Sequence, residues 1–122
     1  FQLAIIPLVD AIAAGNHVMI KPSEFTPRTS ALIRELCAEV FPADRVAVIE
    51  GGAEVGAAFT ALPFDHLLFT GSTAVGRKVM AAAAPNLVPV TLELGGKSPA
   101  LIAPDYDIVH AAERIATGKL FN

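Results

Sequence analysis

The sequence is poor in cysteine and in charged residues, and each shortage excludes a class of protein. Cys37 is the one cysteine among 122 residues. No internal disulfide can form, so the chain is not a disulfide-stabilised secreted domain, and we expect a reducing, cytoplasmic setting. Charged residues make up 17% of the chain and leave a net charge of −3. That balance gives no electrostatic reason to expect nucleic acid as a partner.

Long apolar runs and metal-ligand patterns are also missing. Residues such as Asp10 and Lys21 interrupt the longest apolar stretches, well short of the roughly 20 residues that a membrane span requires. No basic segment ahead of an apolar run predicts a signal peptide. His17, His66 and His110 do not have the spacing of metal ligands, so no metal site is indicated.

What the sequence does contain is a high hydrophobic content, 53% of all residues, arranged in alternating helical and strand patterns. The periodicity predicts helices over residues 1–14, 28–40, 54–62, 74–84 and 107–121, and strands over 17–20, 46–49, 66–70, 90–94 and 99–103. Short apolar strands that alternate with helices favour an α/β fold with a mainly parallel sheet and helices on both faces. One domain over residues 1–122 is expected.

Cys37 lies within the predicted helix 28–40, where its surroundings argue against a reactive role. We expect this helix to bury one apolar stripe, and Cys37 belongs beside it. No glycine turn or helix N-terminus is near to activate the thiol. We therefore interpret Cys37 as a packing residue. The predicted stripe consists of Leu32, Leu36 and Val40, with Ile33 and Cys37 beside it.

The turn after the predicted strand 66–70 has the features of a phosphate-binding turn. Gly71 allows the backbone to approach a ligand closely, Ser72 offers a hydroxyl, and the following helix N-terminus offers free N–H groups. An ordinary turn with a capping serine explains the same residues. Two known phosphate loops do not fit: G-x-G-x-x-G is absent, and Arg77-Lys78 replaces the Lys-Ser/Thr that should follow Gly76 in an NTPase loop.

Lys21 and Glu24 follow the predicted strand 17–20, at a strand end where ligands of parallel sheets bind. Pro22 stiffens the backbone between them and should direct both side chains into the crevice. A lysine can bind ribose oxygens or phosphate, and a carboxylate can accept hydrogen bonds from two neighbouring ribose hydroxyls. The alternative is a solvated ion pair in a loop.

Glu93 ends the predicted strand 90–94, between two leucines and ahead of Gly95-Gly96. Burial at such a position would favour proton uptake by the carboxylate and suit it to base chemistry. A structural ion pair, for example with Lys97, would explain the same placement.

Together these segments resemble the aldehyde dehydrogenase superfamily, and they occur in that family's order along essentially the whole chain. Pro63 to His66 and the final Phe121-Asn122 are most similar to the branch that contains class 3 and coniferyl-type enzymes. The matching strings are Ala14-Gly15-Asn16, Lys21-Pro22-Ser23-Glu24, Phe69-Thr70-Gly71-Ser72 with Val75-Gly76, and Leu92-Glu93-Leu94-Gly95-Gly96-Lys97-Ser98-Pro99.

The resemblance implies a Rossmann-like cofactor domain of an oligomeric enzyme, a homodimer or homotetramer, that oxidises an aldehyde with NAD, or with NADP, through a cysteine thiohemiacetal and thioester. Glu93 matches the general base. Among the matching residues, those implied to bind the cofactor are Lys21, Ser23 and Glu24 at the adenosine ribose, Thr70, Gly71 and Ser72 at the pyrophosphate, Val75 by the adenine, Leu94 and Gly95 near the nicotinamide, and Gly52 as a further contact.

Two groups of the family's reaction have no match in this sequence. The resemblance places the catalytic cysteine a few residues after Asn122 and the oxyanion-hole asparagine just before Phe1, so we expect a chain truncated at both ends. Two other interpretations remain: a nucleotide-binding module without catalysis, and a non-enzymatic α/β interaction domain. Neither the aldehyde nor the choice between NAD and NADP follows from the sequence, because Glu24 repels a 2′-phosphate while Lys21 attracts it.

Overall fold

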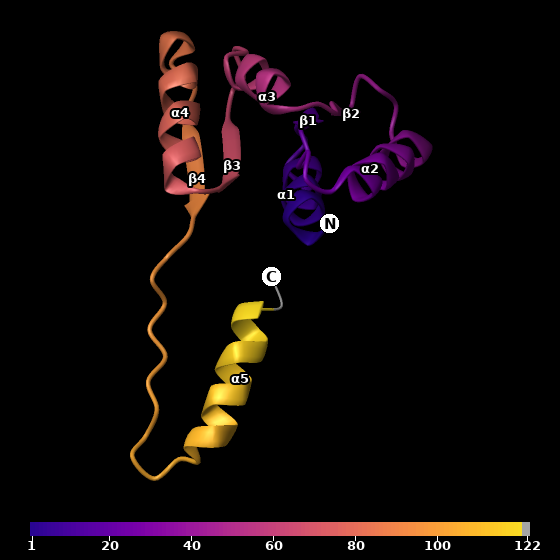
Figure 1. Cartoon of the computed structure of the whole chain (residues 1–122). Coiled ribbons are helices and arrows are strands. Elements are labelled where there is room, and N and C mark those ends of the chain that lie inside the picture. Colours follow the sequence, from indigo (N-terminus) through magenta and orange to yellow (C-terminus); the bar gives the residue numbers. More distant parts are fainter. Residues whose placement is uncertain (121–122) are drawn as a thin grey trace.

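The computed structural model describes residues 1–120 and consists of two parallel strand pairs with helices beside them (Figure 1). Phe121 and Asn122, with which the predicted last helix and the last matching string end, lie outside the described residues. The elements in chain order are α1 (Gln2–Ala13), β1 (Val18–Ile20), α2 (Pro27–Val40), β2 (Val46–Val48), α3 (Ala53–Thr60), β3 (Leu67–Gly71), α4 (Thr73–Ala83), a short 3-10 turn (Ala84–Asn86), β4 (Val90–Leu94) and α5 (Ile108–Leu120).

Parallel pairing, as predicted, joins β1 to β2 and β3 to β4. The first pair aligns Val18 with Val46, and the second aligns Leu67 with Val90 and ends with Gly71 opposite Leu94. The α/β class is confirmed. Within residues 1–120, however, the strands form two separate two-stranded sheets, and not the one continuous sheet that the sequence predicted. Each pair has its own helices: α1 and α2 contact the first pair, and α4 contacts the second.

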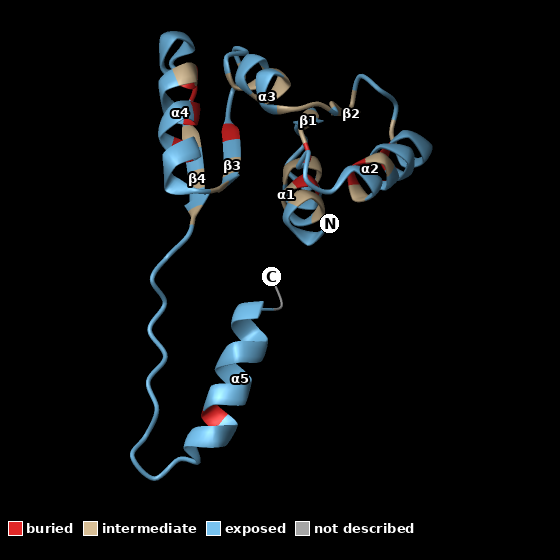
Figure 2. Ribbon diagram, viewed as in Figure 1, coloured by how far each residue is buried: buried red, intermediate tan, exposed pale blue. Residues whose placement is uncertain are grey.

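Two small hydrophobic cores correspond to the two strand pairs. Leu8, Ile33, Cys37 and Val46 form the first core, and Leu67, Val79, Ala83 and Val88 form the second. Figure 2 shows that few residues are buried and that most of them lie where helices meet strands, with one more in α5. None of the helices within residues 1–120 is long and apolar enough to cross a membrane.

The buried face of α2 differs from the predicted stripe. Ser30, Ile33 and Cys37 are buried, whereas Leu32, Leu36 and Val40 are exposed. Apolar residues occur on both the buried and the exposed face of this helix. Hydrophobicity alone therefore did not identify the face that meets α1 and β2. Cys37 is a packing residue, as expected: it is 4% exposed, and burial raises the pKa of its thiol.

Local signals at helix ends were more reliable. Gly15 adopts a φ of +89° just after α1, and its N–H and that of Asn16 donate to the carbonyls of Ile12 and Ala11 at 3.0 Å each. These bonds complete a Schellman C-cap. At the other end of the chain, Asp107 caps α5, because its Oδ1 accepts from the N–H of Val109 at 2.8 Å and of His110 at 3.0 Å.

The predicted strand 99–103 does not form. Residues 95–107 have no regular secondary structure and connect β4 to α5, which stands apart from the other elements (Figure 1). Pro99 has no N–H to donate to a ladder, and no described strand lies beside this segment to pair with it. Nearly all residues from Gly95 to Leu120 are exposed (Figure 2), with Ala111 as the buried exception.

Candidate functional site

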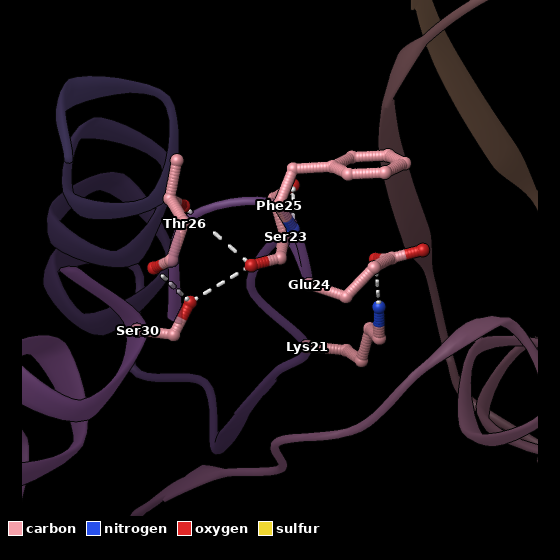
Figure 3. A network of polar contacts seen from close by, with 6 residues as sticks. All are labelled: Lys21, Ser23, Glu24, Phe25, Thr26 and Ser30. Carbon is pink, nitrogen blue, oxygen red and sulfur yellow. Dashed lines mark hydrogen bonds and ion pairs between the residues drawn. The ribbon is translucent and has the colours of Figure 1, made fainter. Parts of the chain in front are cut away.

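Lys21 and Glu24 form an ion pair in the loop between β1 and α2. The Lys21 Nζ lies 2.7 Å from the Glu24 Oε2, and the side chains are 14% and 36% exposed (Figure 3). The hydrogen bond from Lys21 is the main cause that lowers the pKa of Glu24, followed by a backbone hydrogen bond and the positive charge of Lys21. Glu24 is therefore held as a carboxylate, the form that accepts hydrogen bonds from hydroxyl groups.

A second polar network fixes the backbone of the same loop (Figure 3). The carbonyl of Ser23 accepts a hydrogen bond from the Ser30 hydroxyl at 2.9 Å, and the Ser23 hydroxyl accepts from the N–H of Phe25 at 3.3 Å. The Ser30 hydroxyl also lies 3.1 Å from the carbonyl of Thr26. Sequence reasoning missed Ser30, since a serine in the first turns of a helix is common and gives no signal by itself.

The Lys21 side chain lies against the first turn of α3. Gly52 is the N-cap residue of α3, and a Cβ added to Gly56, one turn later, would lie 3.8 Å from the Lys21 Cε and 3.9 Å from its Nζ. These are ordinary van der Waals distances, so they show that the Lys21 side chain packs over the first turn of α3.

The turn from β3 to α4 places four of the predicted residues at a helix N-terminus. Ser72 is the N-cap of α4, and its Oγ accepts from the Val75 N–H at 3.3 Å. The capping serine that we considered as the alternative is thus present, while the hydroxyl hydrogen of Ser72 stays available to a ligand. Thr70 and Gly71 precede it at the end of β3, and Val75 is exposed on the first turn.

Gly76 brings α4 close to the end of β4. This glycine is buried, and an added Cβ would lie 2.9 Å from the Leu94 Cδ2. No larger residue fits there without moving Leu94. The close approach sets α4, with its N-terminus, directly against the strand that carries Glu93.

An open cleft of about 480 Å³ lies at the carboxyl ends of β3 and β4. One wall comes from α1 and the other from the two strands, where Glu93 pairs in register with Thr70. The cleft contains five of the predicted site residues. It is lined by Gln2, Leu3, Ile6, Pro7, Leu68, Thr70, Gly71, Glu93, Leu94 and Gly95.

The surroundings of Glu93 differ from both sequence-based interpretations. Its side chain is exposed, so the expected burial is absent from the described residues. Gly95 still lines the cleft, and the segment after it leads away from β4 (Figure 1). Glu93 also forms no ion pair with Lys97. The predicted residues therefore fall into two groups. The first lies in the loop after β1 and at the N-cap of α3 and consists of Lys21, Ser23, Glu24 and Gly52. The others lie around the cleft and at the start of α4.

Comparisons with known proteins agree on one family. The sequence profile described as "Aldehyde dehydrogenase family" matches residues 1–122. A probable coniferyl aldehyde dehydrogenase of Pseudomonas aeruginosa is 61% identical over 120 residues, which are 98% of this chain and 25% of that protein. The chain thus spans about a quarter of the length of the curated relatives it matches.

Solved structures match as well. Staphylococcus aureus AldH in its substrate-bound state is similar with a TM-score of 0.88 and 52% identity, over 98% of this chain and 26% of that one. A betaine aldehyde dehydrogenase mutant of the same organism, in complex with NAD+, is similar with a TM-score of 0.73 and 35% identity, over 84% of this chain and 21% of that one.

Proposed function

The chain belongs to the aldehyde dehydrogenase family, and we propose that residues 1–122 supply the cofactor-binding part and the general base of a longer enzyme that oxidises an aldehyde to a carboxylic acid with NAD(P)+. The single observation that carries this proposal is the Lys21–Glu24 pair at the carboxyl end of β1, with a distance of 2.7 Å between Nζ and Oε2. In that position, a carboxylate can accept hydrogen bonds from ribose hydroxyls, and a lysine can bind a ribose oxygen or a phosphate of an adenosine nucleotide.

The remaining residues fit a dinucleotide in chemical terms. Glu24 would accept from ribose hydroxyls, Lys21 would donate to a ribose oxygen, and Ser23 and Gly52 would border them. The α4 N-terminus offers N–H groups and the Ser72 hydroxyl to a pyrophosphate, beside Thr70 and Gly71. Val75 gives an exposed apolar surface for adenine, and Leu94 with Gly95 would face the nicotinamide. When bound, NAD(P)+ supplies the hydride acceptor.

Glu93 is the residue we assign to proton abstraction. It lies in the cleft at the end of β4, and a carboxylate there can take a proton from a nucleophilic thiol or from water. Cys37 is not that thiol in our proposal: it is buried in the first core, and a thiol with a raised pKa is a poor nucleophile at neutral pH. The nucleophile therefore comes from outside residues 1–122.

Two coarser features of the enzyme complete the proposal. Large apolar side chains such as Leu3, Leu101 and Leu120 are exposed, and such surfaces are expected to be covered by further segments or by subunits of a homodimer or homotetramer. A cytoplasmic location is consistent with the one free thiol. A nucleotide-binding module without catalysis is the second candidate. Two observations favour it: the Lys21–Glu24 pair is preformed, and Glu93, at a different place in the structure, is exposed.

The choice of cofactor tests the proposal. In the complete enzyme, Glu24→Gln should shift the ratio of kcat/KM for NAD to that for NADP toward NADP by about tenfold, because it removes one negative charge near the 2′ position. Glu39→Gln, an exposed glutamate on α2, is the matched control and should leave the ratio unchanged. Equal ratios in all three proteins would exclude the assigned role of Glu24.

A further inference from the structure

Ser30 is the one buried polar side chain that the structure shows within residues 1–120, at 3% exposure. Its hydroxyl lies 3.1 Å from the carbonyl of Thr26, four residues earlier in the chain, which is the usual partner of a helical serine. The same hydroxyl lies closer, at 2.9 Å, to the carbonyl of Ser23. That second partner is seven residues away and belongs to the loop, so the contact is not a property of the helix alone.

The Ser23 carbonyl is the point where the loop is fixed. Besides Ser30, it accepts from the Thr26 N–H at 3.3 Å and from the Thr26 hydroxyl at 3.5 Å. The Ser30 contact is the shortest of the three, and hydrogen bonds weaken as the distance grows. This carbonyl is part of the peptide bond to Glu24, and that bond is planar. Fixing the carbonyl therefore fixes the orientation from which the Glu24 backbone continues.

We propose that Ser30 is a positioning residue for the cofactor: its hydroxyl holds the Ser23–Glu24 peptide plane, so that Glu24 meets Lys21 and both reach an adenosine ribose without rearrangement. This inference rests on the proposed function. Pro22, which is buried, restrains the backbone directly before Ser23. Ser30 is too deeply buried to touch a ligand itself, so it acts through the peptide plane and is distinct from Lys21, Ser23 and Glu24.

The experiment compares variants of the complete enzyme by steady-state kinetics. Ser30→Ala should raise the KM for NAD by about fivefold, since one buried hydrogen bond is lost, while kcat and the KM for the aldehyde stay within about twofold, because uniform cofactor binding is affected. Ser30→Thr keeps the hydroxyl and should restore the KM. Thr60→Ala removes a hydroxyl that donates to the Ala57 carbonyl at 3.1 Å on α3 and should change nothing.

A second comparison covers the case in which Ser30→Ala does not fold. Ser30→Thr and Ser30→Val have the same shape and differ in the hydroxyl, so a higher KM for NAD in Val than in Thr supports the proposal. Equal KM values for NAD in the serine, threonine, alanine and valine proteins that fold would overturn it. If the unmodified enzyme shows no saturable use of NAD, the proposed function itself fails, and that result is distinct from unchanged variants of an NAD-using enzyme.

Discussion

The Lys21–Glu24 loop and the surroundings of Glu93 lie at the carboxyl ends of the two parallel strand pairs, yet they are built to different degrees. In the loop, an ion pair and a set of side-chain-to-backbone hydrogen bonds hold the charged groups (Figure 3). Glu93 is exposed and makes no side-chain hydrogen bond to any of residues 1–120. Within residues 1–120, the Lys21–Glu24 loop is therefore preorganised by its own side-chain contacts, whereas the Glu93 side chain has no such partner.

Sequence separation explains the difference. All the hydrogen bonds that fix the loop join residues between 2 and 7 positions apart, so little chain entropy is lost when they form. The cleft around Glu93 instead depends on α1, far away in sequence, and its apolar wall stays open: Leu3 is 65% exposed and Leu68 43%. The open wall leaves the Glu93 carboxylate accessible to water.

The largest expected effect is a loss of turnover on substitution of Glu93. In the complete enzyme, Glu93→Gln should reduce kcat by about 100- to 10,000-fold, the usual contribution of a general base, and leave NAD affinity unchanged. Stopped-flow measurement of NADH formation, with NAD titration by calorimetry, separates the two. Glu39→Gln on α2 is the control. Full turnover of the Glu93 variant at every pH would reduce this residue to a structural role.

A smaller effect, on the free energy of unfolding, is expected where α4 packs against β4. Gly76→Val places a side chain where even a Cβ would lie 2.9 Å from Leu94, and overpacking of this kind lowers the free energy of unfolding by about 1–3 kcal/mol. Gly76→Ala adds the Cβ alone and should lower the free energy of unfolding less than Gly76→Val does. Denaturant unfolding of the complete enzyme measures both. Equal stabilities would show that α4 does not approach β4 as described.

The smallest effect concerns the protonation of Glu24. The hydrogen bond from Lys21 lowers the pKa of Glu24 below its ordinary value of 4.5. A lowered pKa in the folded state means that the pair stabilises the fold above the unfolded pKa, and that this contribution is lost as the pH falls through the lower folded value. A carboxyl-carbon NMR titration should show the shift. Lys21→Met should raise the Glu24 pKa toward 4.5, and Lys78→Met should not.

The sequence predicted local structure well and long-range arrangement poorly. The strand at Val90–Leu94 was predicted to the residue, and the end of α1 at Gly15 followed from a glycine in a left-handed conformation. The strand expected at 99–103 did not form, because a strand needs a neighbour that no local pattern guarantees. In the same way, the sequence predicted α2 and the packing role of Cys37, but not that Ser30 faces the core while Leu36 is exposed.

The candidate site shows the same division. Lys21 and Glu24 were expected to point into one crevice, because they follow a strand and Pro22 stiffens the backbone between them. The structure shows the alternative that the sequence also offered, an ion pair in the loop, and the role in cofactor binding stays a prediction. The burial expected for Glu93 could not be judged, because it depends on segments distant in sequence. Ser30 was missed, since its contribution is a hydrogen bond to a loop carbonyl seven residues away, which no local pattern predicts.

We propose that residues 1–122 carry a cofactor anchor and a base but not the nucleophile. The most direct test is to purify residues 1–122 and record NADH absorbance after adding aldehyde at saturating NAD. We predict no aldehyde-dependent NADH formation, because Cys37 is buried at 4% exposure and no other cysteine is present. Steady NADH formation that Cys37→Ser abolishes would contradict the claim.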